Sequence, residues 1–84
     1  MQVTHEFDMR SVCPVNGATD WYHVTIHLDR LVMVEEIIEC ASAFGEKRLF
    51  QEEITQRLAI QFKARVITYG NHSKVRTRCE CSFL

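Results

Sequence analysis

The sequence predicts an α+β domain with the element order ββααββ, and three observations lead to this prediction. Near both ends of the chain, hydrophobic residues alternate with polar ones, a period that is typical of half-buried strands. Between these stretches, hydrophobic residues recur at helical spacing in two segments. Two strands on either side of two helices are expected to form an antiparallel four-stranded sheet with both helices on one face.

The first two strands are predicted over 3–9 and 21–28. The first strand has a mainly hydrophobic face made by Val3, His5, Phe7 and Met9. The second has a hydrophobic face made by Tyr22, Val24, Ile26 and Leu28. Its other face is rich in polar and aromatic groups, so we expect it to border solvent or a site. That face consists of Trp21, His23, Thr25 and His27. Pro14 and the pair Asn16-Gly17 predict a turn between the two strands.

The two helices are predicted from Met33 to Phe44 and from about Leu49 or Phe50 onward. The hydrophobic stripe of the first helix consists of Met33, Ile37, Cys40, Ala41 and Phe44. Gly45 is expected to end this helix, because glycine is common just after helix C-termini. Acidic residues in the first turn of the second helix complement the helix dipole. That turn is Gln51-Glu52-Glu53, and the hydrophobic stripe behind it is Ile54, Leu58 and Phe62.

The last two strands are predicted over 64–69 and 75–83, joined by a hairpin connection at Gly70-Asn71-His72-Ser73. Residues 1–84 are therefore expected to form a single domain. The outer strands of its sheet would have unpaired edges, which invite association with other strands. Closing several sheets into one barrel removes such edges, so we expect a cyclic homo-oligomer.

Length, charge and cysteine content limit the possible functions. With 84 residues, the chain is near the lower limit for burying a core unaided, so its hydrophobic fraction of 46% suits contact with another subunit. The net charge of −1 excludes the global basic field of a dedicated nucleic-acid binder. Neither an apolar run of membrane-spanning length nor a signal-peptide pattern is present. We therefore expect a cytoplasmic protein without a membrane partner, whose four cysteines are reduced thiols.

Cys13 and Asp20 are the first candidates for chemistry. A thiol is nucleophilic as the thiolate, so its pKa must be lowered by nearby cations or amide donors, and Arg10 is close in sequence. The turn at Asn16-Gly17 can bring Asp20 into the same pocket, where a carboxyl group can shuttle protons to whatever the thiol attacks. A buried structural cysteine and an exposed turn aspartate are the alternative interpretations.

Three further groups have both a functional and a structural interpretation. Glu52 and Glu53 are typical helix-terminus acids, but a carboxylate facing a pocket would suit a guanine-like edge with two adjacent donors. Zinc binding through Cys13, a histidine and Cys79 or Cys81 is an alternative, but no spacing matches a recognised zinc pattern, so we predict no metal. The basic residues near the final hairpin suit either a solvated strand face or phosphate contacts. They are Arg65, Lys74, Arg76 and Arg78.

The segment Ser11-Val12-Cys13-Pro14-Val15-Asn16-Gly17-Ala18-Thr19-Asp20-Trp21 resembles the signature of the nitrile reductase family QueF, which reads broadly S-[LV]-C-P-x-[TS]-G-x-x-D-[FWY]. Phe50-Gln51-Glu52-Glu53 resembles the family's F-H-E-[DE] helix start, with Gln51 in place of the histidine. The resemblance covers nearly the whole chain and implies the tunnelling fold. It also implies that Cys13 is the nucleophile and Asp20 the proton donor. Glu52, together with Gln51, would bind the substrate base.

In this family the cysteine adds to the nitrile of 7-cyano-7-deazaguanine and forms a covalent thioimide, which the reductases reduce with two hydrides from NADPH. The reductase cofactor motif, E-[SL]-K-S-x-K, is missing here, and no lysine occurs between Arg30 and Lys47. The resemblance therefore implies no NADPH cofactor. It favours the shorter QueF-like archaeosine synthases, which lack the same motif and use ammonia to convert the nitrile on a modified tRNA base into an amidine.

The resemblance implies that the partner molecule is a deazapurine base, free or within tRNA. In tunnelling-fold enzymes such sites lie between subunits, so we expect Cys13 and Glu52 to meet across a subunit boundary. The alternatives are an NADPH-dependent reductase of the queuosine pathway, a pterin-binding tunnelling-fold enzyme and a non-catalytic paralogue. The pterin synthases need a metal-binding set of histidines, and His23 and His27 would lie roughly 13 Å apart on a strand, too far for one ion.

Overall fold

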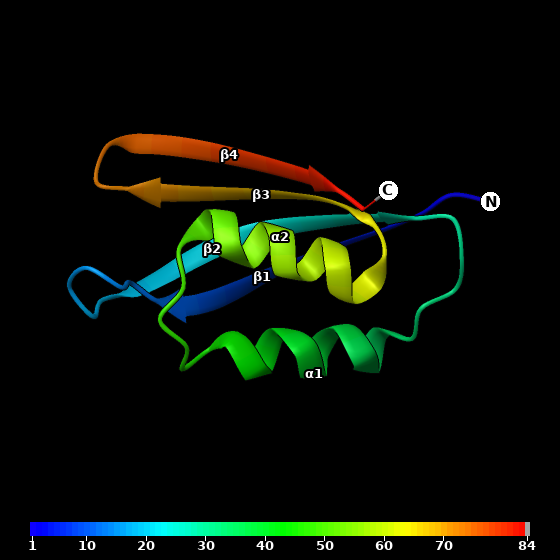
Figure 1. Ribbon diagram of the computed structural model, residues 1–84, viewed down its shortest axis with the longest axis horizontal. Helices are drawn as coiled ribbons and strands as arrows, with labels where there is room; N and C mark the ends of the chain where they lie inside the picture. The colour runs from blue at the N-terminus through cyan, green and yellow to red at the C-terminus, as the bar shows by residue number, and fades with distance from the viewer. Residues whose placement is uncertain (84) are drawn as a thin grey trace.

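The computed structural model describes residues 1–83 and has the predicted element order (Figure 1). Its elements are β1 (Val3–Val12), β2 (Thr19–Leu28), α1 (Val34–Phe44), α2 (Gln51–Phe62), β3 (Arg65–His72) and β4 (Val75–Ser82). The strands form one sheet in the order β1-β2-β3-β4, and every neighbouring pair is antiparallel. Both helices cover the same face of the sheet, α1 against β1 and α2 against β3 and β4. The predicted α+β class and topology are confirmed.

Two connections between strands differ from the predicted ones. β1 and β2 continue pairing to the ends of the ladder, with Ser11 opposite Asp20, so the connection shortens to residues 13–18. The predicted hairpin connection at 70–73 is wrong, because His72 pairs with Val75 and leaves a two-residue turn at residues 73–74. Ser73 takes a positive φ of 57°, as tight hairpin turns of this kind require. Gly70 therefore lies inside a strand, opposite Tyr22.

The helix termini depend on local hydrogen bonds. α1 ends at Phe44 as predicted, but Gly45 keeps a right-handed φ of −58°, so left-handed freedom of glycine does not end this helix. The N–H group of Gly45 instead donates to the carbonyl oxygen of Ser42. At the start of α2, the Glu53 carboxylate accepts a hydrogen bond from the N–H group of Phe50 at 3.1 Å. Glu53 thus has the helix-terminus role that the sequence allowed for both neighbouring acids.

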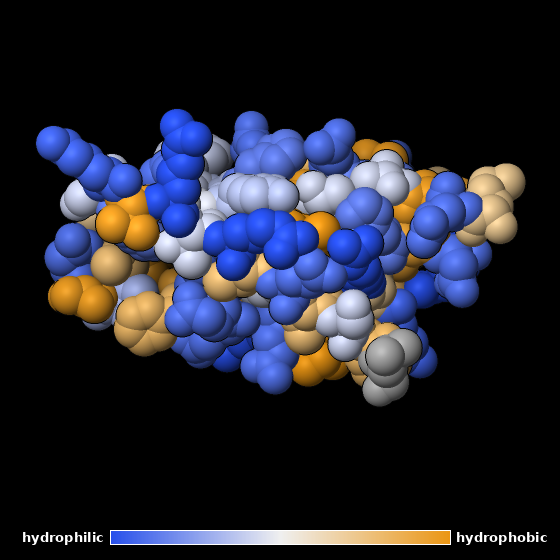
Figure 2. All heavy atoms as spheres, turned by 90° about the horizontal axis from the view of Figure 1, so that it is seen from above, coloured by the Kyte–Doolittle hydropathy of each residue, from blue (hydrophilic) through white to orange (hydrophobic). Residues whose placement is uncertain are grey.

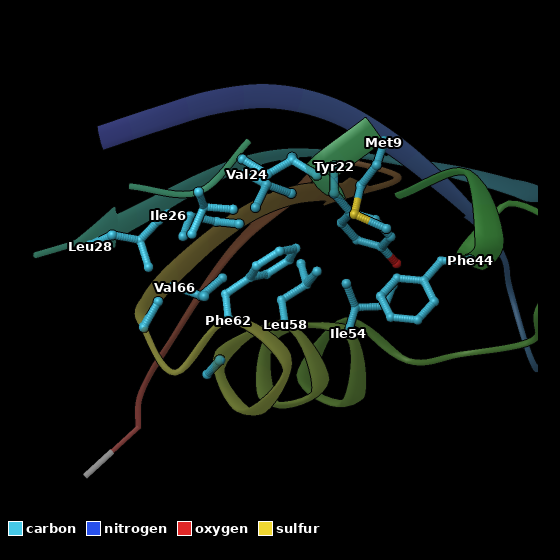
Figure 3. Close-up of a cluster of buried hydrophobic side chains, with 14 of the residues drawn as sticks. Met9, Tyr22, Val24, Ile26, Leu28, Phe44, Ile54, Leu58, Phe62 and Val66 are labelled. Carbon is cyan, nitrogen blue, oxygen red and sulfur yellow. The ribbon is translucent and has the colours of Figure 1, made fainter. Parts of the chain in front are cut away.

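The hydrophobic core lies between the sheet and α2 (Figure 3). Alternate side chains of β2 point down from the sheet, and side chains of α2 one turn apart point up to meet them. The sheet contributes Met9, Tyr22, Val24, Ile26, Leu28 and Val66, and the helices contribute Ile37, Phe44, Ile54, Leu58 and Phe62. The predicted hydrophobic faces of the second strand and second helix therefore form this core. Tyr22, predicted as part of the apolar stripe, carries a hydroxyl group at the end of the core near Phe44.

β1 and β4 form the outer edges of the sheet, and within residues 1–83 neither edge pairs with a further strand apart from a single bridge between Val12 and Arg48. Figure 2 views the molecule from the β4 side, where hydrophilic side chains cover most of the surface and hydrophobic ones lie between them in separate patches. Such edges expose backbone donors and acceptors that another strand can use. No helix among the described residues is long and apolar enough to cross a membrane.

Candidate active site

Three connections far apart in the sequence meet at one end of the molecule. The β1–β2 connection, the start of α2 and the β3–β4 hairpin all lie at the left end in Figure 1. Side chains from these segments surround a pocket of about 260 Å³. Its lining consists of Cys13, Pro14, Val15, Asp20, Tyr22, Leu49, Phe50, Gln51, Glu52, His72 and Thr77. All four residues predicted as catalytic or substrate-binding are among them.

The β1–β2 connection holds Cys13 at the edge of this pocket. The backbone N–H of Cys13 donates to the carbonyl oxygen of Ala18 at 2.7 Å, and the N–H of Gly17 donates to the Cys13 carbonyl oxygen at 2.9 Å. Gly17 has a φ of 76°, a left-handed conformation that favours glycine. The Asn16 side chain accepts the N–H of Ala18 at 2.9 Å and closes the turn. The connection is thus a hydrogen-bonded loop that fixes the half-buried thiol of Cys13.

Asp20 is the most buried carboxyl group of the site, with 14% of its side chain exposed. The Tyr22 hydroxyl group donates to its Oδ2 at 3.4 Å. His72 faces the other oxygen, with its Nδ1 3.8 Å from Oδ1. Burial, together with the nearby Asp20 carboxylate, raises the pKa of Tyr22 to about 12. The phenol therefore stays protonated near neutral pH and acts toward Asp20 as a hydrogen-bond donor.

Gln51 is almost completely buried, with 3% of its surface exposed. Its amide nitrogen lies within 3.2 Å of three acceptors, the carbonyl oxygens of Thr68 and Thr77 and the hydroxyl oxygen of Thr68. Because carbonyl oxygens only accept, the amide must face them with its nitrogen, which turns Oε1 the other way. Oε1 has no hydrogen-bond partner among the described residues, is shielded from solvent and lies beside Gly70. A buried acceptor without a partner is costly unless a ligand or water supplies a donor.

Glu52 follows directly and is exposed toward the pocket opening. Glu53 caps the helix, whereas Glu52 lines the pocket. The thiol of Cys79 on β4 lies 4.0 Å from Glu52 Oε1 and donates weakly to it. Burial, and next the carboxylate of Glu52, raises the pKa of Cys79 above its ordinary value. Cys79 therefore remains a thiol and is a poor nucleophile.

Cys13 and Glu52, which we expected to meet across a subunit boundary, line the same pocket of one chain. The sequence did not point to three other lining residues, Tyr22, His72 and Thr77. Tyr22 belongs to a hydrophobic stripe, and its hydroxyl group was the one available signal of a polar role. The sequence predicts His72 within the hairpin connection. Its position depends on the pairing of β3 with β4, which local sequence does not reveal.

The predicted basic cluster is divided by an acidic residue. Glu80 accepts hydrogen bonds from Arg65 at 2.6 Å and from Arg78 at 2.7 Å, which lowers the pKa of Glu80 below its ordinary value. Lys74 and Arg76 have no such ion pair among the described residues. Lys74 lies in the turn that follows His72, and Arg76 lies on β4, where it lines a different pocket with Asp8 and His23. Within residues 1–83, no group of three or more His, Cys, Asp or Glu side chains is arranged to hold a metal ion.

The comparisons with known proteins concern the fold. No protein-family profile and no curated protein matches the sequence. Among solved structures, the chain is similar to the crystal structure of the archaeosine synthase QueF-Like in the apo form, with a TM-score of 0.83 and 14% sequence identity. The similarity covers 95% of this chain and 90% of that one. The chain therefore has the tunnelling fold predicted from the resemblance, in the form that a QueF-like protein adopts.

Proposed function

We propose that this chain is a nitrile-acting enzyme in which Cys13 forms a thioimide with 7-cyano-7-deazaguanine, and that ammonia converts the thioimide into an amidine. One observation carries the proposal: a single pocket is lined by a cysteine, a buried aspartate, a second acidic residue and a buried glutamine whose amide oxygen has no partner among the described residues. These are the groups that recognition and activation of a nitrile on a purine-like base require.

In this proposal, residues at the start of α2 recognise the base. The carboxylate of Glu52 can accept from both adjacent donors of a guanine-like edge, the ring N–H and the exocyclic amine. The Oε1 of Gln51 is buried and unpartnered among the described residues, and a shift of this side chain toward the pocket would supply one more acceptor for an N–H group of the base. A volume of about 260 Å³ is below the range of roughly 300–1,000 Å³ typical of drug-sized ligands and suits a single base.

In this proposal, Cys13 and Asp20 carry out the reaction with the nitrile. Sγ of Cys13 adds to the nitrile carbon, and the thiol proton reaches the nitrile nitrogen through Asp20, so thiol and nitrile become a thioimide. Ammonia then forms a bond to the same carbon while the C–S bond breaks. The proton lost by the ammonia nitrogen returns to the sulfur. The products are an amidine and the free thiol of Cys13, without any change of oxidation state.

The substrate context follows from the sequence and from the structural neighbour. The lysine-bearing motif of the reductases is missing, which supports amination over reduction. The similar solved structure is that of an archaeosine synthase, and this also supports amination. A base within tRNA would bring phosphates close to the hairpin, where Lys74 and Arg76 can bind them.

The test is mass spectrometry of the protein mixed with 7-cyano-7-deazaguanine. We expect a mass increase equal to the base, located at Cys13, in wild type and in Cys40→Ala. Cys13→Ala should show none. Cys40 is the matched control because it is half-buried on α1 and lines a different groove, and burial raises the pKa of its thiol. Ammonia should then release the amidine.

Two results would contradict the proposal. An unmodified wild type under saturating base would show that Cys13 is not a nucleophile for this nitrile. Nitrile-dependent oxidation of NADPH would instead identify a reductase, since hydride transfer is the step that separates the two reactions.

A further inference from the structure

His72 is the imidazole that lies in the pocket, and neither the sequence motif nor the chemistry above gives it a role. It is the last residue of β3, and its Nδ1 lies 3.8 Å from Oδ1 of Asp20. Its ring centroid is 6.4 Å from that of Tyr22. About half of the His72 side chain is exposed (47%), whereas 14% of the Asp20 side chain is exposed. His72 therefore connects a buried carboxyl group with solvent.

We propose that His72 exchanges protons between Asp20 and solvent during turnover, an inference that rests on the proposed nitrile chemistry. Asp20 carries the thiol proton to the nitrile nitrogen, and the amidine that forms is a strong base that takes up one further proton, which must reach the site from solvent. Burial of Asp20 restricts direct exchange with water. An imidazole can both accept and donate a proton near neutral pH, which makes histidine the usual carrier for such steps.

The other neighbour of Asp20 is unsuited to this task. The Tyr22 hydroxyl group, whose pKa is raised to about 12, keeps its proton near neutral pH and orients Asp20 by donating to Oδ2. The proton balance through His72 is simple. Imidazolium gives its proton to the carboxylate, becomes neutral imidazole and takes another proton from water or a buffer acid. The 3.8 Å separation is closed by a small side-chain rotation or by one bridging water.

The fold does not depend on the imidazole ring of His72. The backbone at this position is held by pairing with Val75 across the hairpin, and the side chain is half exposed. Substitution of the ring should therefore leave the structure intact and change only the proton transfer.

The experiment compares amidine formation by wild type, His72→Ala and His72→Gln, with free imidazole added or omitted. We expect both variants to slow turnover by about 10²-fold, the lower end of general acid–base effects. Cys13 should still become labelled by the base. Imidazole should restore a large part of the rate in His72→Ala, where it can occupy the vacated space. His27→Ala is the matched control, because His27 lies on the helix-free face bound to Thr4 and should keep the wild-type rate.

The outcomes separate this inference from the proposed function. Wild-type turnover with an unchanged rate in His72→Ala overturns the role of His72 and leaves the proposed function standing. A slow His72→Ala that imidazole does not restore, with His72→Gln equally slow, assigns the residue to packing and also overturns the inference. A wild type that neither takes up the base nor forms the amidine overturns both. Circular dichroism of the two variants checks that they are folded.

Discussion

The ring of Tyr22 occupies the space that a side chain at residue 70 would need. A Cβ atom on Gly70 would lie 2.7 Å from Cδ1 and Cε1 of Tyr22, closer than real Cβ contacts. The same atom would lie 3.0 Å from Oε1 of Gln51. Glycine inside β3 thus lets the ring and the amide oxygen approach the backbone, which places the Tyr22 hydroxyl group at Asp20.

Gly70→Ala should therefore lower the free energy of unfolding by about 1–3 kcal/mol, the usual cost of overpacking a well-filled site. It should also slow amidine formation, because the displaced ring no longer orients Asp20. Urea denaturation measures the first effect. Asn71→Ala, at the exposed neighbouring position, should change stability by less than about 0.5 kcal/mol. Equal stability of Gly70→Ala and wild type would refute the close packing.

Gln51→Leu removes both the unpartnered acceptor and the donor that serves two carbonyl groups of the sheet. We expect a stability loss of about 1–3 kcal/mol from the unsatisfied carbonyl oxygens, together with weaker base binding. Calorimetry in a Cys13→Ala background measures binding without the covalent step. Gln56→Leu changes an exposed residue of the same helix and should leave both quantities near wild type. Undiminished base binding by Gln51→Leu would remove Gln51 from the recognition site.

Arg76→Glu tests whether the base is presented within tRNA. If Arg76 binds a phosphate, charge reversal should weaken tRNA binding and reduce its dependence on salt concentration, while labelling of Cys13 by the free base stays unchanged. Binding is measured by fluorescence anisotropy at several salt concentrations. Arg57→Glu makes the same charge change on α2, in the groove between the helices, and should bind tRNA like wild type. Identical salt dependence in wild type and Arg76→Glu would argue for the free base.

His23 should make stability depend on pH. Its Nδ1 lies 3.0 Å from Asp8 and its Nε2 lies 3.3 Å from Glu6, and these two hydrogen bonds raise the pKa of His23 above its ordinary value. The contribution of His23 to the free energy of unfolding is therefore fully present below about pH 6.5, the pKa of histidine in the unfolded chain. It is lost as pH rises through the higher pKa that His23 has in the folded chain. Because the groups are exposed, the contribution should stay below about 1 kcal/mol and decrease with salt.

Urea denaturation of wild type and His23→Gln, at about pH 6 and about pH 9, measures this difference in stability. The two proteins should differ at the lower pH and converge at the higher one. A difference that grows with pH would contradict the sign of the pKa shift. His27→Gln serves as the control, since within residues 1–83 His27 binds the Thr4 hydroxyl group and no carboxylate.

The open edges of β1 and β4 should be closed by other copies of the chain in a cyclic homo-oligomer. Light scattering measures the number of subunits, and activity should fall on dissociation if a neighbouring chain completes the pocket. Since Cys13 and Glu52 line one pocket of one chain, mixed oligomers of Cys13→Ala and Glu52→Ala should remain inactive. Recovery of activity after verified subunit exchange would show that the two residues act across a boundary. An active monomer would contradict the assembly.

The sequence by itself determined the order of the elements and the faces that form the core. Alternation in the strands and helical spacing around Ile54 and Leu58 are local properties, because burial on one side of an element leaves its period in the sequence. The candidates Cys13, Asp20, Gln51 and Glu52 also came from short local segments. The structure brings these four into one pocket of one chain, whereas the resemblance implied that Cys13 and Glu52 meet across a subunit boundary.

The tertiary structure determined the position of the hairpin turn and the identity of the other residues that line the pocket. The sequence placed Gly70 and His72 in a connection, because glycine and asparagine favour turns locally. Pairing of His72 with Val75 moved the turn to residues 73–74, since strand register is set by hydrogen bonds and packing across the whole sheet. That register brings His72 to Asp20, and the antiparallel pairing of Tyr22 with Gly70 opens the space for the tyrosine ring. Contacts between residues so far apart in the chain leave no periodic signal in the sequence, so they can be identified only in the folded structure.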